Sequence, residues 1–124
     1  MRKSSPVLVA LLLISCAATQ IHPGSPNAFD SATYDTLVAT HSVIESTKTD
    51  LAANSFPASI SANVKTALNA LIQAYDVADT AYQAYHSSAL AGTATTAQQA
   101  AVSSAITQVN TSTTNLTNAK AAKP

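Results

Sequence analysis

Residues 64–89 read VKTALNALIQAYDVADTAYQAYHSSA, and apolar or tyrosine residues recur in this stretch every three or four positions. The recurring positions are Val64, Leu68, Leu71, Tyr75, Ala78, Tyr82, Tyr85 and Ala89. A repeat of about 3.5 residues lines up side chains on one face of an α-helix, whereas a β-strand requires a period of two. The stretch therefore predicts one long amphipathic helix.

The same spacing occurs on both sides of this stretch. Before it, the predicted core-facing positions are Tyr34, Leu37, His41, Ile44, Lys48 and Leu51. After it, they are Val102, Ile106, Val109, Thr113 and Leu116. The repeat predicts a helix on each side of the first one, and so three helices in all.

Helix-breaking and capping residues separate the three segments. Ser25 before Pro26 suits an N-cap followed by proline at the first helical position. Pro57 disfavours helix at the residue before it, and Gly92 suits the position just after a helix. Thr95 and Gln98 match a capping box, in which each side chain covers a free backbone N–H group of the other residue.

These signals predict helices over residues 26–53, 58–91 and 96–121. Connections this short favour antiparallel neighbours, so the expected fold is all-α: an up-down-up three-helix antiparallel bundle over residues 26–124. We expect the third helix to be the weakest, because residues 107–117 are dense in serine and threonine, which are poor helix formers relative to alanine.

The N-terminal residues have the order of a secretory signal peptide. Arg2 and Lys3 precede the apolar run 7–14, and small residues follow it. A permanent membrane span needs about 20 apolar residues, so this run is too short for one. The sequence predicts a removable leader over residues 1–15, followed by a flexible tether over residues 16–25.

Leu13-Ile14-Ser15-Cys16, which closes the apolar run, resembles the lipobox of bacterial lipoproteins. The resemblance implies diacylglycerol on the Cys16 sulfur, cleavage before Cys16 and acylation of the new amino terminus. Two or more acyl chains anchor a protein stably where one does not. Ala17 is not Asp, which resembles the sorting pattern of outer-membrane lipoproteins and implies a chain that faces the periplasm. The alternative is ordinary cleavage after Ala18, which would release a soluble secreted chain without cysteine.

Composition excludes several classes of function. Arg2 is the only arginine, so the chain lacks the clustered basic residues of a nucleic-acid binder. A single cysteine forms neither an internal disulfide nor a zinc site made of cysteines. Without Arg2 and Lys3, four lysines face six acidic residues, so the mature chain is weakly acidic.

Tyr34, Tyr75, Tyr82 and His41 are the candidate ligand-binding residues, because together they would line a groove between the first two helices. The alternative is that the tyrosine rings fill an alanine-rich core and keep their hydroxyls at its edge. An antiparallel pairing that turns near residue 55 would bring Tyr34 close to Tyr75.

The histidines and acidic pairs do not form a predicted active site. His41 and Glu45 are one turn apart, but the same pairing places His86 two or three turns from His41, as a surface residue near a helix end. Asp76 and Asp79 are expected on a solvated face. We therefore predict no metal site, no cofactor and no catalytic residues.

The sequence thus predicts a non-enzymatic bacterial lipoprotein with a structural or protein-interaction role in the cell envelope. Its expected partners are the membrane, through lipid on Cys16, and either an envelope protein or further copies of the same chain. One alternative is a periplasmic module that binds a small ligand or metal between the first two helices. Another is an envelope lipoprotein of a phage or mobile element.

Overall fold

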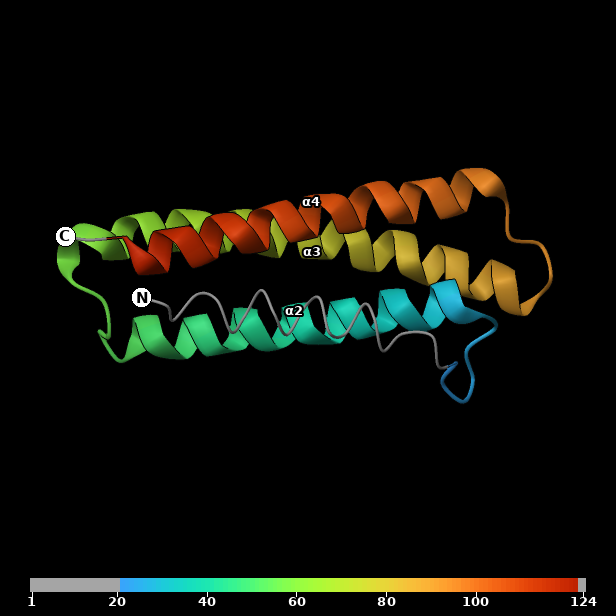
Figure 1. Cartoon of the computed structure of the whole chain (residues 1–124), viewed down its shortest axis with the longest axis horizontal. Coiled ribbons are helices and arrows are strands. Elements are labelled where there is room, and N and C mark those ends of the chain that lie inside the picture. The colour runs from blue at the N-terminus through green and yellow to red at the C-terminus, as the bar shows by residue number, and fades with distance from the viewer. Residues whose placement is uncertain (1–20, 123–124) are drawn as a thin grey trace.

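Three helices account for most of residues 21–122, the part of the chain that this computed structural model describes: α2 (Ala28–Ala52), α3 (Ala58–Leu90) and α4 (Thr96–Ala121). They run up, down and up beside one another (Figure 1), which confirms the predicted all-α bundle. Every helix end lies within two residues of its predicted position. The predicted leader over residues 1–15 and Cys16 lie outside the described residues.

Local signals define both connections. The side chain of Thr95 accepts the backbone N–H of Gln98, and the side chain of Gln98 accepts that of Thr95, so the predicted capping box is confirmed. Gly92 has a φ of +76°, a left-handed conformation that glycine adopts without a steric penalty just after a helix. Asn54, in the first connection, has a φ of +57°, which asparagine tolerates better than most residues do.

The core-facing side of α2 differs from the prediction. Its buried residues are Asp30, Ser31, Thr33, Leu37, Thr40, Ile44 and Thr47. Leu37 and Ile44 agree with the prediction, but Tyr34, His41 and Lys48 are exposed. Threonines take core-facing positions because each buried hydroxyl donates to the backbone carbonyl four residues earlier, as Thr40 does to Thr36 at 2.8 Å.

The core runs along all three helices. Its fully buried apolar side chains are Val64, Leu71, Ala78, Val102, Val109 and Leu116. In α4, Ala105 is buried one residue before the predicted Ile106, which is half-buried and packs against the same core. A small residue such as Ala105 lets two helices approach closely.

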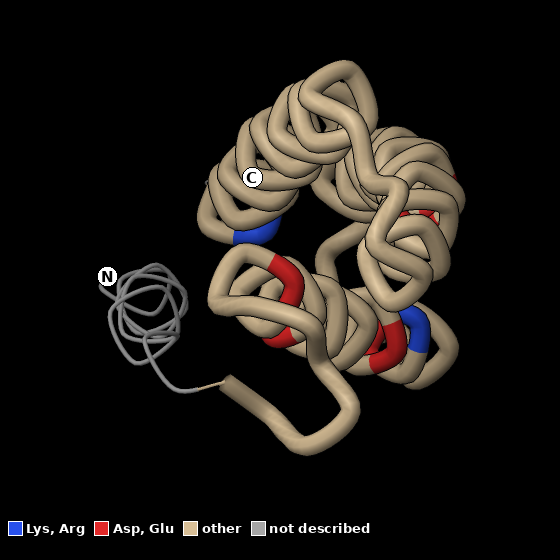
Figure 2. Tube along the Cα trace, turned by 90° about the vertical axis from the view of Figure 1, so that its right-hand side faces the viewer, with Lys and Arg blue, Asp and Glu red and all other residues tan. Residues whose placement is uncertain are grey.

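The three helices are not packed equally. Seen along the bundle they lie at the corners of a triangle (Figure 2). The closest pair is α3 and α4, while α2 lies further from α3 and touches α4 least. Among the described residues, no helix is long and apolar enough to cross a membrane.

Candidate functional site

The first turn of α2 holds a network of polar contacts. Asn27, rather than the predicted Ser25, is the N-cap: its side-chain oxygen accepts the backbone N–H of Asp30 at 2.9 Å. The amide nitrogen of Asn27 donates to the Tyr85 hydroxyl at 3.0 Å, which ties the start of α2 to the end of α3. The helix therefore begins two residues later than predicted.

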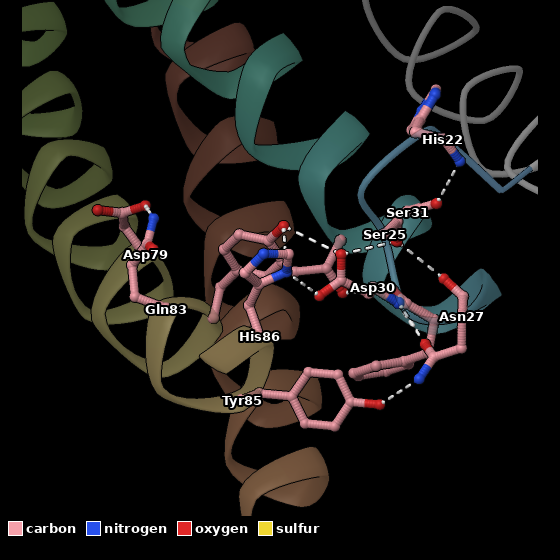
Figure 3. A network of polar contacts seen from close by, with 12 residues as sticks. His22, Ser25, Asn27, Asp30, Ser31, Asp79, Gln83, Tyr85 and His86 are labelled. Carbon is pink, nitrogen blue, oxygen red and sulfur yellow. Dashed lines mark hydrogen bonds and ion pairs between the residues drawn. The ribbon is translucent and has the colours of Figure 1, made fainter. Parts of the chain in front are cut away.

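Asp30 is the centre of this network, and only 1% of its surface is exposed. Its Oδ1 atom accepts the hydroxyls of Ser25 at 2.8 Å and Tyr82 at 3.1 Å. Its Oδ2 atom lies 2.7 Å from Nδ1 of His86. An ionised carboxylate only accepts hydrogen bonds, so Nδ1 of His86 carries the hydrogen in this pair. Figure 3 shows Asp30 and His86 pointing toward each other from α2 and α3.

This environment changes the acidity of Tyr82. Burial of the phenol is the main cause that raises its pKa well above the ordinary value, and the neighbouring Asp30 charge and hydrogen bond add to the effect. The phenol therefore stays protonated and remains a donor to Asp30. In the same cluster the Ser25 hydroxyl donates to Asp30 and not to the imidazole of His86.

The position of His86 corrects the predicted surface location. Its side chain is about a quarter exposed and is paired with a buried carboxylate. The cause is a shift of α3 along α2. The prediction assumed that the two helices pair symmetrically about residue 55. The observed ring pairs are Tyr34 with Tyr82, at 6.5 Å between centroids, and His41 with Tyr75, at 6.0 Å. The expected Tyr34–Tyr75 ring pair is replaced by these two.

The offset amounts to roughly five residues, or about 8 Å along a helix axis. The first turns of α3 extend past the end of α2, and the last turns of α3 lie against the beginning of α2. The Asp30–His86 contact and the two ring pairs carry most of this offset, whereas the Asn27–Tyr85 and Asp30–Tyr82 bonds lie about two residues from the symmetric pairing.

A groove follows the line between α2 and α3. It consists of two cavities of about 400 and 310 Å³ that share Tyr34, Tyr82 and Gln83 in their walls. We call it the α2–α3 groove. Tyr34, His41, Tyr75 and Tyr82, the four candidate ligand-binding residues, all line the smaller cavity. The larger cavity lies above the Asp30 cluster and is also lined by His22 and His86.

Residues from the end of the predicted tether close one side of the larger cavity. The backbone N–H of His22 donates to the Ser31 hydroxyl at 2.9 Å, and its ring Nε2 lies 2.7 Å from a carboxylate oxygen of Asp35. The ring of His22 also meets that of Tyr34 edge-on at 6.1 Å. Residues 22–25, which the sequence predicts as part of a flexible tether, are therefore held against α2.

Charge is distributed unevenly along the bundle. The described lysines, Lys48, Lys65 and Lys120, belong to the end of the bundle where α2 meets α3, which they share with two acidic residues of α2. The rest of the described charges are acidic and lie toward the other end: Asp30, Asp35, Asp76 and Asp79. Asp79 is half-buried at the wall of the groove, contrary to the predicted solvated face, whereas its neighbour Asp76 is exposed as predicted.

The acidic residues act on Tyr75 as well. Its pKa is raised first by burial, then by the charge of Asp79 and then by that of Asp76. In the described part of the chain, no three histidine, cysteine or acidic residues are grouped so that they would hold a metal ion. The electrostatic character of the groove thus comes from carboxylates beside aromatic rings.

A second hollow lies between α3 and α4. Its volume is about 650 Å³, and alanine, serine and glutamine side chains line it together with Val77, which is 63% exposed. Among the described residues that line it, none is charged and none comes from α2. We call it the α3–α4 groove.

Comparison with known proteins gives no relative. No protein family, no curated protein and no solved structure matches this chain. The assignment of a function therefore depends on the sequence and on the two grooves.

Asp30 is the residue of this polar network that sequence reasoning missed. One signal is present: Asp30, Thr33, Leu37 and Thr40 continue a spacing of three and four residues. A prediction that ranks neighbouring residues by apolar character selects Tyr34 in place of Thr33. The predicted core-facing side is then shifted by one residue along the sequence.

Proposed function

We propose that this chain is a lipid-anchored bacterial lipoprotein that holds a three-helix bundle in the cell envelope and acts without catalysis. The observation that carries the proposal is the sequence Leu13-Ile14-Ser15-Cys16, placed directly after a charged and apolar leader. The lipid attached to Cys16 would be the membrane contact, and Ala17 favours the outer membrane, facing the periplasm. A structural or protein-interaction role is supported by the uncharged α3–α4 groove.

Intact mass spectrometry of the protein from a membrane fraction tests the anchor. The expected mass is that of a chain beginning at Cys16 and carrying three acyl chains. The Cys16→Ala variant should lose this mass and should no longer be processed before residue 16, while Ser5→Ala in the leader should leave both unchanged. An unmodified mass beginning at residue 19 would instead establish the secreted soluble chain and reject the anchor.

A second candidate function is the capture of a small ligand between α2 and α3. The observation that favours it is the placement of Tyr34, His41, Tyr75 and Tyr82 along one groove. Cavities of this size are typical of small-molecule sites. Because a ligand that binds only the folded chain raises the unfolding midpoint, thermal unfolding with a panel of divalent metals, sugars and organic ions tests this function. A midpoint that no compound changes would reject it.

A further inference from the structure

We infer that the α2–α3 groove binds an organic cation with a quaternary ammonium group, which lies against the exposed ring of Tyr34 and the half-buried ring of Tyr75, beside Asp79. This inference rests on the ligand-binding function proposed above and names its ligand class.

The first argument is the exposure of the aromatic rings. Tyr34 is 50% exposed, although the preceding residue of α2 is buried. The centroid of its ring lies 6.5 Å from that of Tyr82, and the two ring planes are tilted by 43°. About two turns further along α2, the ring of His41 is 6.0 Å from that of Tyr75. These rings line one continuous groove, and the faces of tyrosine rings attract cations that come within about 6 Å of the ring centre.

The second argument is charge. Asp79 follows Tyr75 and precedes Tyr82 on α3 and forms part of the groove wall. From the described residues its carboxylate accepts one long hydrogen bond, from Gln83 at 3.5 Å. Asp35 is paired at 2.7 Å with His22, which lines the larger cavity. Among the described residues that line the two cavities, none is lysine or arginine. A hollow with one sign of charge and low-dielectric walls concentrates ions of the opposite sign.

The third argument concerns the kind of cation. Divalent metals require several oxygen or nitrogen ligands in a compact group, and the described residues contain no such group. A primary ammonium carries three donors, each of which needs an acceptor after leaving water. A quaternary ammonium has no donor, so aromatic faces and one nearby carboxylate suffice. The cavities, at about 400 Å³ and about 310 Å³, are each large enough for a trimethylammonium group and a short substituent.

Asp79 and Asp76 provide a matched pair for the test. Both lie on α3 three residues apart and each substitution to asparagine removes one negative charge, but only Asp79 lines the groove. Titration calorimetry of the mature chain with choline and tetramethylammonium is the measurement. We expect Asp79→Asn and Tyr34→Leu each to weaken binding about tenfold. Asp76→Asn should weaken it less than about twofold, because its charge lies outside the groove and is screened by solvent.

The ligand panel separates charge from shape. The compound 3,3-dimethylbutan-1-ol has the shape of choline without its charge, and we expect it to bind at least about tenfold more weakly. Phosphocholine compares the two sources of the group: a preference for choline assigns a free ligand, and a preference for phosphocholine assigns a lipid headgroup. Equal binding of choline and its neutral analogue, or equal effects of the two asparagine variants, would overturn the inference.

Failure of the ligand class is distinguishable from failure of the binding function. If an N-acetylglucosamine oligomer raises the unfolding midpoint and the ammonium compounds do not, the groove binds a ligand but the cation assignment is wrong. If no compound in the panel binds, both are wrong. Circular dichroism of Tyr34→Leu and Asp79→Asn without ligand checks that both variants keep the helical fold.

Discussion

Asp30 shows how a single side chain joins two helices that are distant in sequence. It lies in the first turn of α2, where a negative charge is favoured by the helix dipole, and it receives donors from Ser25 and from two residues of α3. Burial of a charge costs free energy unless such donors are present. The contacts of Asp30 therefore determine how α2 is aligned with α3.

We predict that Asp30→Ala lowers the free energy of unfolding by about 1.5–3 kcal/mol, since the variant leaves the Tyr82 hydroxyl and the His86 ring without their acceptor. Urea denaturation followed by circular dichroism measures the change. Asp76→Ala is the control, because Asp76 is exposed. Its loss should alter stability by less than about 0.5 kcal/mol. Equal effects of the two variants would show that the buried network does not stabilise the fold.

The raised pKa of Tyr82 predicts a loss of stability at high pH. In the unfolded chain the phenol releases its proton near the ordinary pKa of 10.0, while in the folded chain it keeps the proton to higher pH. Above pH 10 the unfolded state therefore binds fewer protons, and the free energy of unfolding falls as the pH rises. Tyr82→Phe should be less stable than the parent chain at pH 7 but should show a smaller fall between pH 9 and pH 11.

Denaturation midpoints at several pH values measure this difference between the chains. Stability that falls equally in both above pH 10 would indicate that Tyr82 is not the group responsible. Tyr75, whose pKa is also raised, should account for part of the fall that Tyr82→Phe retains.

Residues with local partners were predictable, and residues with distant partners were not. Thr95 and Gln98 cap a helix through atoms three residues apart, so their sequence is sufficient to predict the bond. Asn27 and Asp30 depend on Tyr85 and His86, more than fifty residues away. No local signal indicates which of these side chains will be brought together.

Each helix forms as its periodic pattern predicts, but the identity of the core-facing side of α2 depends on a property of threonine. Thr33, Thr40 and Thr47 are buried because each hydroxyl is satisfied by its own helix, through a bond of 2.8 or 2.9 Å. Tyr34 and His41 carry polar groups that cannot be satisfied in this way and lie outside. The aromatic ring of Tyr34 favours that position over Thr33, and the spacing of three and four residues then selects His41 and Lys48 on the neighbouring face.

The buried threonines lead to a prediction for α4. Thr113 is 1% exposed and donates to the carbonyl of Val109 at 2.8 Å, an oxygen that also serves the backbone of the helix. Thr113→Val keeps the shape and removes a desolvated hydroxyl, so we expect the free energy of unfolding to rise by about 0.5–1 kcal/mol. Thr113→Ala should lower it, because the lost methyl group leaves a cavity. Urea denaturation of the two variants measures both changes.

Thr107 is the matched control on the same helix, since it makes the same kind of bond, to Ser103 at 3.0 Å, in an exposed position. Thr107→Val should change stability by less than about 0.5 kcal/mol. If Thr113→Val is destabilising by more than this amount, the buried hydroxyl contributes more than its desolvation costs.

For the molecule as a whole, the number, direction and ends of the helices were predictable, but their relative offset was not. Apolar period, capping residues and short connections determine the up-down-up arrangement. The offset of roughly five residues between α2 and α3 depends on which side chains fit one another across the interface. An antiparallel pair drawn symmetrically about its loop therefore places His86 at the surface, although it lies against Asp30.

The unequal packing of the three helices predicts which one detaches first. Composition points to α4, which is rich in serine and threonine. In the folded chain, however, α4 and α3 approach closely through small residues, while α2 is held mainly by Leu37, Ile44 and the Asp30 network. α4 contacts α3 far more extensively than α2 does, and the dispersion energy of this contact offsets the low helix propensity of α4. Hydrogen exchange of the mature chain should therefore show lower opening free energies for the central amides of α2 than for those of α3 and α4. Asp30→Ala should lower the values in α2 further and leave those at the α3–α4 contact almost unchanged, whereas faster exchange in α4 than in α2 would show that helix propensity outweighs packing.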